Sequence, residues 1–385
     1  MKRSSDRILT THTGSLPRPP ELQDALARFD RGEGDPPDPG SVAEAVKGIV
    51  RRQAENGVDV VNDGEMGKVS YSTYVVSRLS GFGGTGKALE LGDARDFPGW
   101  ARMSGFDDTS TLLALPACID DVRYVGEAEV ETDIANLKAA VADADVQETF
   151  LSAASPGVIS AFLDNQHYPS HEAYLRALGQ AMKTEYDTIH AAGIVLQIDC
   201  PDLAMGRHIQ FPDASFDEWR RTIELHVEVL NDATRDIPPQ DMRMHLCWGN
   251  YEGPHHLDVP LVDIIEIVLR ARPAAISFEA ANPRHEHEYH VFEDVKLPDG
   301  KLLLPGVLDS TTNYIEHPEL VAERITRYAN LVGRENVLAS TDCGFATGAA
   351  IVPIHPDVTW AKFRAMAEGA ELATQQLWAG SAAAV

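Results

Sequence analysis

Short runs of apolar and β-branched residues recur along the chain, and longer segments with helical spacing of apolar residues separate them. Runs of this length are typical of strands buried on both faces, as in a parallel sheet covered by helices. The pattern predicts eight strands, at residues 8–12, 58–63, 148–152, 194–199, 242–247, 275–279, 303–309 and 337–342.

Helical periodicity fills most of the segments between these runs. It predicts helices at residues 41–56, 170–192, 216–234, 259–272, 318–332 and 358–378. Regular alternation of strands and helices predicts an α/β protein with a (β/α)8 barrel. No segment resembles a domain linker, so we expect one domain over residues 1–385.

Two segments do not fit the simple alternation. Residues 31–40 are rich in proline and glycine, which predicts a surface loop. Residues 81–130 are too many for an ordinary strand-to-helix connection. We expect them to form an excursion after the second strand, inserted over the mouth of the barrel.

Polar side chains gather at or just beyond the carboxyl ends of the predicted strands. In barrel enzymes this rim carries the active site, so we expect the functional residues there. The residues in question are His12, Asp63, Glu65, Asp199, His245, Cys247, Glu279, Asp309 and Cys343.

Composition excludes several functions. The formal net charge of −26 disfavours binding to nucleic acid or to anionic lipid, because both need a basic surface. No stretch approaches 18 consecutive apolar residues, and no apolar segment follows Met1 directly, so we expect a cytoplasmic protein without a membrane span. Four cysteines are too few for a disulfide framework, which leaves metal ligation or thiol reactivity as their special roles.

His245 and Cys247 lie two residues apart on a predicted strand, so their side chains share one face. Glu279 ends the next strand and Cys343 follows the last one. Imidazole, thiolate and carboxylate together suit Zn²⁺. The alternative is a pair of buried free cysteines beside a core histidine, and spacing alone leaves both interpretations open.

Several motifs, in this order, resemble the catalytic half of cobalamin-independent methionine synthase, and the likeness extends over nearly the whole chain. They are Thr10–Pro17, Asp63-Gly64-Glu65, Gln197–Pro201, His245-Leu246-Cys247, Ser277-Phe278-Glu279, Pro305–Asp309 and Thr341–Gly344. The resemblance implies a TIM barrel and a zinc ion held by His245, Cys247, Glu279 and Cys343.

The chain also departs from that family pattern. The Asp-Glu-Pro-Ala motif of the family reads Asp199-Cys200-Pro201-Asp202 here. The expected catalytic histidine after Pro305-Gly306-Val307 is replaced in the segment 309–312, which makes Asp309 the candidate catalytic residue. The extra N-terminal barrel of the synthase has no counterpart. Other segments are similar to the single-barrel branch that includes epoxyalkane:coenzyme M transferase.

The resemblance implies methyl transfer to the thiol of homocysteine, which gives methionine. Glu65 and Asp199 would then bind the amino group, and Ser15 and Trp248 are further candidate substrate-binding residues, with Trp248 able to stack on a flat donor. The structural alternative for the two acids is helix capping or pairing with arginine. The partners are a small-molecule thiol and an alkyl donor. A 5-methyltetrahydrofolate, a methylated corrinoid protein or a small metabolite all stay open as donors, as does the oligomeric state.

Two other functions remain. One is a related zinc alkyltransferase with another thiol, such as coenzyme M, whose sulfonate would need a cation; Arg18, Lys68 and Arg207 are the candidates. The other is a metal-binding barrel without catalytic activity.

Overall fold

Seven parallel strands form the central sheet of the computed structural model, which describes residues 1–87, 89–106, 115–349 and 353–379. The strand order β1-β4-β5-β6-β7-β8-β9 follows the order of the chain. The strands coincide with seven of the eight predicted runs, although β1 and β9 are shorter than expected. Their bounds are Val60–Val61, Glu148–Ala154, Val195–Asp199, Met242–Leu246, Ala275–Phe278, Leu302–Leu308 and Ser340–Thr341.

The remaining predicted strand, residues 8–12, forms only an isolated bridge between Thr10 and Ala339. At this bridge, Thr10 Oγ1 donates to the Gly57 carbonyl and contacts Asp59. The predicted α/β class is therefore confirmed, with a parallel sheet of seven strands in the described part of the chain, while closure into an eight-stranded barrel stays a prediction.

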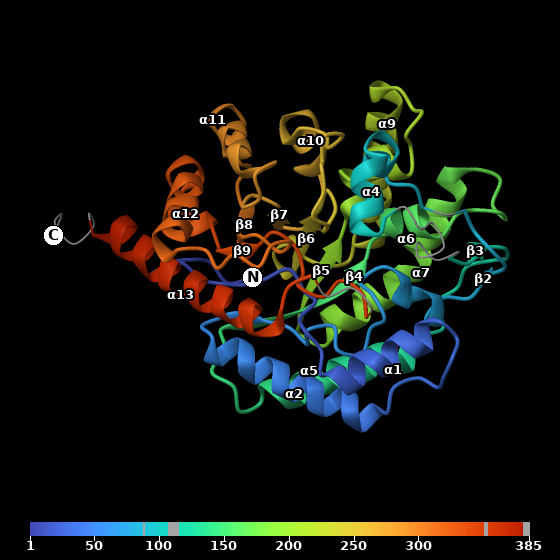
Figure 1. The fold of residues 1–385 in the computed structure, drawn as a ribbon, viewed down its shortest axis with the longest axis horizontal. Helices are drawn as coiled ribbons and strands as arrows, with labels where there is room; N and C mark the ends of the chain where they lie inside the picture. Colours follow the sequence, from blue (N-terminus) through green and yellow to red (C-terminus); the bar gives the residue numbers. More distant parts are fainter. Residues whose placement is uncertain (88, 107–114, 350–352, 380–385) are drawn as a thin grey trace.

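All six predicted helices are present, within a few residues of their expected ends. They are α2 (Pro39–Glu55), α7 (His171–Ala191), α9 (Phe216–Ala233), α10 (Leu261–Val268), α12 (Pro318–Val332) and α13 (Pro356–Trp378). The sequence pattern did not predict α1 (Pro20–Asp30), α5 (Glu127–Val141) or α6 (Pro156–Phe162). Figure 1 shows α9, α10, α11 (Val291–Asp294) and α12 following one another on one side of the sheet, with α13, α2, α5 and α1 on the other.

Local sequence explains where these helices begin. Ser215 and Glu218 form a capping box at the start of α9, and Asp38 accepts a hydrogen bond from Ser41 N at the start of α2. The buried face of α9 includes Trp219, which is fully buried. Short 3-10 helices connect other elements, at Thr73–Ser77, Pro201–Leu203, Pro239–Asp241, Glu286–His290 and Arg334–Asn336.

The predicted excursion at residues 81–130 has structure of its own. The strands β2 (Phe82–Gly83) and β3 (Ala117–Cys118) pair antiparallel, and the short helices α3 (Gly92–Asp96) and α4 (Pro98–Ser104) lie between them in sequence. Residue 88 and residues 107–114 of this segment lie outside the described residues. Outside this segment, the short helix α8 (Gly206–Ile209) follows β5, and its last residue lines the cavity described below.

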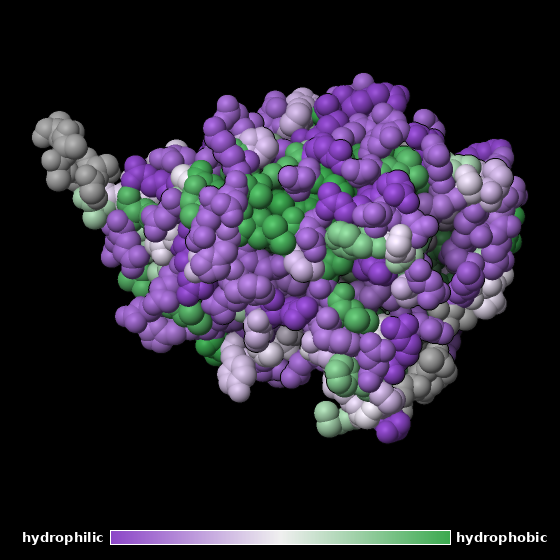
Figure 2. All heavy atoms as spheres, turned by 90° about the horizontal axis from the view of Figure 1, so that it is seen from above, coloured by the Kyte–Doolittle hydropathy of each residue, from purple (hydrophilic) through white to green (hydrophobic). Residues whose placement is uncertain are grey.

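Among the described helices, none combines the length and hydropathy needed to cross a bilayer. Hydrophilic residues cover most of the face shown in Figure 2, with a hydrophobic area toward its middle.

A buried ion pair fixes the chain after β8. Lys362 Nζ on α13 lies 3.0 Å from both carboxylate oxygens of Glu316 and donates to the Asp309 carbonyl. We expect Lys362→Met to lower the free energy of unfolding by about 3–5 kcal/mol, because it leaves Glu316 buried without its cation. Denaturant unfolding measures the loss, with exposed Lys47→Met as the matched control. Equal stability of the two variants would contradict this role.

Candidate metal and substrate site

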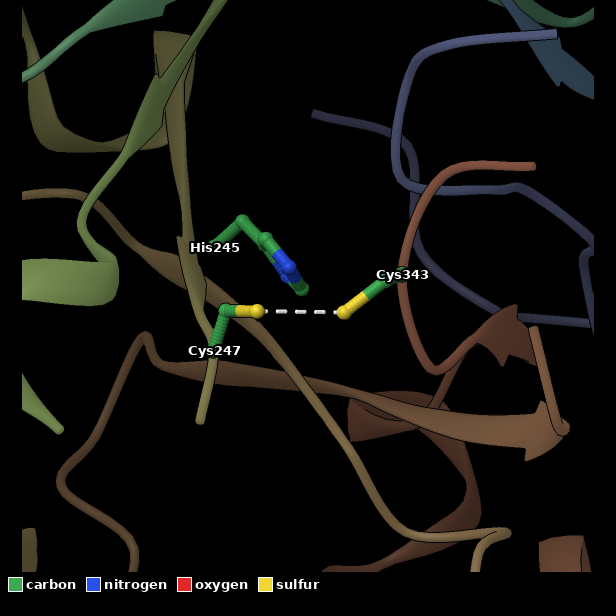
Figure 3. A group of neighbouring side chains, drawn as sticks. All are labelled: His245, Cys247 and Cys343. Carbon is green, nitrogen blue, oxygen red and sulfur yellow. Dashed lines mark hydrogen bonds between the residues drawn. The ribbon is translucent and has the colours of Figure 1, made fainter. Parts of the chain in front are cut away.

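Strand β6 and the chain just after β9 bring two thiols and an imidazole together. Ligand atoms of His245, Cys247 and Cys343 all lie within 4.8 Å of one another, and all three residues are buried. The two Sγ atoms are 3.2 Å apart. In Figure 3 the side chains of His245 and Cys247, from one strand, point toward Cys343 on the facing segment. The i, i+2 spacing therefore places its two side chains on one face, as predicted.

The protonation states of this group suit a metal that replaces protons. Burial lowers the pKa of His245 to about 3, so its ring is neutral, and its Nδ1 atom has no hydrogen-bond partner. Burial raises the pKa of Cys343 well above its usual range. The hydrogen bond with Cys343 lowers the pKa of Cys247, but burial and nearby Glu279 outweigh it, and the net shift is upward. Without a metal, both thiols are protonated near neutral pH; this donor set fits Zn²⁺, whose binding would release their protons.

Glu279 lies beside this group rather than within it. Its Oε1 atom is 3.7 Å from Cys343 Sγ and accepts a hydrogen bond of 2.7 Å from Trp248 N. Its Oε2 atom accepts from the Asn282 side chain at 2.8 Å. Both oxygens are therefore engaged, and ligation by Glu279 stays a prediction.

Asp342, directly after β9, supports the site. Its Oδ1 atom accepts from the backbone of Ala280 and Ala281, at 2.7 and 2.8 Å. A Cβ atom on Gly306 would lie 2.0 Å from the same oxygen, so the close approach of β8 requires glycine there. Asp342, the residue before Cys343, thus holds the chain that follows Glu279 close to the segment that carries Cys343.

A cavity of about 870 Å³ opens onto the two thiols, a volume in the range of small-molecule sites. Its lining includes His245, Cys247 and Cys343, together with the acids Glu65 and Asp199. The structure therefore brings the predicted metal ligands, apart from Glu279, and the predicted amino-binding acids to one cavity.

The two acids are buried, and Glu65 is incompletely paired. Glu65 adopts a left-handed backbone conformation with φ of 58°, an arrangement that costs energy and is often found at functional sites. Its Oε1 accepts from Ser152 at 2.7 Å, while Oε2 has no hydrogen-bond partner. Burial and the Glu65 charge raise the pKa of Asp199 to about 8. Gly14 is needed nearby, since a Cβ atom there would lie 2.6 Å from Glu65 Oε1.

The remaining predicted site residues lie in different places. Ser15 lines the cavity. Trp248 is fully buried, donates from Nε1 to the Val259 carbonyl and packs on His285, and it is not among the residues that line the cavity. Asp309 is also outside that lining. Stacking of Trp248 on a donor therefore finds no support in the geometry.

Asp309 is occupied within its own loop. Its carboxylate accepts from Thr311 N, Thr311 Oγ1 and Thr312 Oγ1, at 2.8, 2.8 and 2.6 Å. We expect Asp309→Ala to lower stability by about 1–3 kcal/mol while metal content and the KM of the thiol stay unchanged. A fall of a hundredfold or more in kcat at unaltered stability would instead support the catalytic role predicted from the sequence.

The three cations proposed for a sulfonate all lie outside the lining of this cavity. The Arg18 guanidinium donates to the carbonyls of Glu65, Lys68 and Ala346. Lys68 donates to the Ser152 carbonyl, and Arg207 to the Phe211 carbonyl. All three cations therefore stabilise backbone segments.

Sequence reasoning missed much of the cavity wall. Tyr71, Trp100, Phe106 and Tyr251 line it, and three of these four lie in the excursion or in the loop after β6. None of the four is among the site residues predicted from the sequence, because loop residues carry no periodicity. The one available signal was aromatic enrichment in the segment predicted to overhang the strand ends.

A thiol–imidazole group at the carboxyl ends of parallel strands places the protein in the class of α/β proteins with a candidate metal site at that rim. Within that class, the chain belongs to the cobalamin-independent synthase family, whose catalytic-domain model matches residues 158–370. The family predicted from the motifs is thus confirmed, and with it membership of an enzyme family.

Two similar relatives illustrate the different names that occur among the matches. The 2-hydroxypropyl-CoM lyase of Xanthobacter autotrophicus is 24% identical, with 96% of each chain covered. The methionine synthase of Thermococcus kodakarensis is also 24% identical, over 88% of this chain and 84% of the relative. The solved B12-independent methionine synthase from Shewanella, in complex with selenomethionine, has a TM-score of 0.70 at 20% identity, with 97% and 99% covered. This structural likeness shows a shared fold.

Proposed function

We propose that the protein is a zinc-dependent S-methyltransferase that acts on the thiol of homocysteine and forms methionine. One observation carries the proposal: the thiol–imidazole group and the buried acids Glu65 and Asp199 line the same cavity, and Glu65 Oε2 has no hydrogen-bond partner. Relatives named methionine synthase agree with it. A substrate-sized cavity at the group favours catalysis over the alternative of a silent metal-binding barrel.

His245, Cys247 and Cys343 would hold the ion, with Glu279 as the fourth and most readily displaced ligand. Bound Zn²⁺ would keep the substrate sulfur as a thiolate, which is the nucleophilic form of a thiol. The protein's own contribution is a buried site that limits access of water and holds the acceptor close to the alkyl donor.

Glu65 and Asp199 are suited to hold the amino group of the acceptor. An ammonium placed between them would supply the partner that Glu65 Oε2 lacks. It would also offset the mutual repulsion that, with burial, raises the pKa of Asp199 to about 8. Charge-assisted hydrogen bonds of this kind are stronger than neutral ones.

A related zinc alkyltransferase that uses coenzyme M is the second candidate, and the relative named 2-hydroxypropyl-CoM lyase is the observation that favours it. The charges in the cavity favour the amino thiol instead. The Glu65 carboxylate would repel a sulfonate, and Arg18, Lys68 and Arg207 lie outside the lining.

We further propose that residues 9–11 complete a barrel. Supporting bonds reach both edges of the sheet: Ala339 N donates to the Leu9 carbonyl at 2.9 Å, and Val60 N donates to the Thr10 carbonyl at 3.0 Å. The proposal includes one cytoplasmic domain over residues 1–385, in which residues 81–130 would be an insertion over the barrel mouth. The cavity lining from Leu89 to Phe106 supports that placement.

A product assay tests the acceptor. The protein is incubated with homocysteine or coenzyme M and a panel of methyl and epoxide donors, and products are identified by mass. We expect methionine from at least one donor. Alkylation of coenzyme M alone would reject the homocysteine assignment and support the second candidate.

A further inference from the structure

The cavity lining falls into two chemically different groups. Strand ends and the turns after them supply the thiols, the imidazole and the acids. The excursion, α6 and α8 with their flanking turns supply a largely apolar surface, made of Leu89, Leu91, Trp100, Met103, Phe106, Phe162, Met205 and Ile209. A thiol acceptor accounts for the first group, and the second is left for the alkyl donor.

Three aromatic rings form one continuous surface, here called the aromatic wall: Trp100, Phe106 and Tyr251. Trp100 and Phe106 are stacked, with ring centroids 5.2 Å apart and an interplanar angle of 20°. Phe106 meets Tyr251 edge to face at 5.7 Å. The wall therefore joins the excursion to the loop after β6.

A buried carboxylate in α3 fixes the wall in place. Asp93 Oδ2 accepts from Tyr251 Oη at 2.9 Å and from His255 N at 2.6 Å. The His255 ring stacks on Tyr251 with centroids 4.2 Å apart. Because these contacts need no ligand, the surface is organised before a donor arrives, which reduces the entropy lost on binding.

Charge in the cavity is of one sign. Its lining carboxyl groups are those of Glu65, Asp199 and Glu252. The pKa of about 8 leaves Asp199 mostly protonated at neutral pH, so Glu65 and the exposed Glu252 carry the negative charge. No lysine or arginine is among the described lining residues, and residues 88, 107–114 and 350–352 include neither type in the sequence. A donor bearing carboxylates, such as the glutamyl tail of a folate, would be repelled here rather than paired.

We propose that the alkyl donor is a small molecule without anionic groups, either neutral or a cationic onium, whose apolar part lies against the aromatic wall. The inference rests on the proposed alkyl transfer to a thiol. In that step the bond from the alkyl carbon to its leaving atom breaks and the pair of electrons stays on the leaving atom. The thiolate pair forms the new carbon–sulfur bond. An onium leaves as a neutral molecule, while a neutral donor's leaving atom takes up the equivalent of the proton lost by the thiol.

Binding of three similar probes to the full metal-loaded chain, without thiol, tests the donor class. The probes are trimethylphenylammonium, its neutral isostere tert-butylbenzene, and the anion 4-tert-butylbenzoate, measured by calorimetry alongside a methylfolate triglutamate. We expect the two anions to bind at least tenfold more weakly than the cation and the neutral probe. Anions that bind equally well would overturn the proposal, and so would the absence of binding by every probe.

Two variants locate the effect. Trp100→Ala should weaken the cation and the neutral probe about tenfold, through lost ring contact. The control is Phe97→Ala. Phe97 directly precedes α4, the helix of Trp100, and its exposed ring does not line the cavity. Equal losses in both would place the probes elsewhere and reject the wall.

Glu252→Lys provides a test that does not disturb the buried core. A cation at this exposed lining position should strengthen 4-tert-butylbenzoate binding several-fold, and an unchanged value would contradict the charge argument. These measurements use no thiol. The expected order of probe affinities can therefore be found even if homocysteine is not the acceptor, and homocysteine can be the acceptor even if that order is not found. The two proposals therefore fail separately.

Discussion

Replacing both Cys247 and Cys343 by serine is expected to reduce the zinc content from about one ion per chain to less than roughly a tenth of that value. The two thiols lie 3.2 Å apart beside His245 and supply half of the proposed ligands. Zinc sites of this type draw roughly 10–16 kcal/mol from their full ligand set at pH 7, so the loss of two thiolates removes a large share. Elemental analysis of the purified protein measures the content.

Two further buried cysteines provide matched controls. Cys118 and Cys200 are free and buried, and neither lines the cavity. The double variant Cys118→Ser, Cys200→Ser should keep its zinc. If the Cys247, Cys343 variant retained full occupancy, the metal would be held elsewhere and the assignment would be wrong.

The second large effect concerns the acceptor. Asp199→Asn should raise the KM of homocysteine roughly 10- to 150-fold, because a hydrogen bond to a charged partner contributes about 1.5–3 kcal/mol. Zinc should stay bound, since Asp199 is not in the thiol–imidazole group. Steady-state kinetics with parallel metal analysis separates the two effects.

An acceptor without an amino group sharpens this test. 4-Mercaptobutyrate has the same thiol and carboxylate but lacks the ammonium, so Asp199→Asn should change its KM far less than that of homocysteine. Asp309→Asn is the control variant, because its side chain faces its own loop. An equal change for both thiols would mean that Asp199 acts structurally and does not hold the amino group.

Much of the fold follows from patterns along the chain, because buried parallel strands leave unbroken apolar runs and helices leave a 3.6-residue period. This identified β4 to β8 and helices such as α7 and α9 closely. The run at 8–12 is also apolar and β-branched, yet it forms only one bridge, at Thr10, whose backbone N–H donates to the Asp59 side chain instead of to a neighbouring strand. Helix α5 lies mostly beyond the predicted excursion, and it escaped prediction because its apolar residues are only weakly segregated on one face.

The site was predictable where ligand chemistry and strand spacing coincide. His245 and Cys247 share a strand face, and Cys343 follows a strand that ends at the same rim, so their meeting could be anticipated. Asp309 and Trp248 are also adjacent to strand ends, but their polar atoms are used by the neighbouring backbone and hydroxyl groups. Such occupancy depends on loop geometry, which a linear pattern does not contain.

Cobalt substitution tests the central claim, thiol activation at the His245, Cys247 and Cys343 group, most directly. Cobalt in place of zinc gives a visible absorption that reports sulfur ligation. Addition of homocysteine should strengthen the sulfur-to-cobalt charge-transfer band and release a proton near neutral pH, whereas homoserine, its alcohol analogue, should do neither. If no thiol changes the spectrum or releases protons while the metal remains bound, the site does not activate a thiol and the proposed function is wrong.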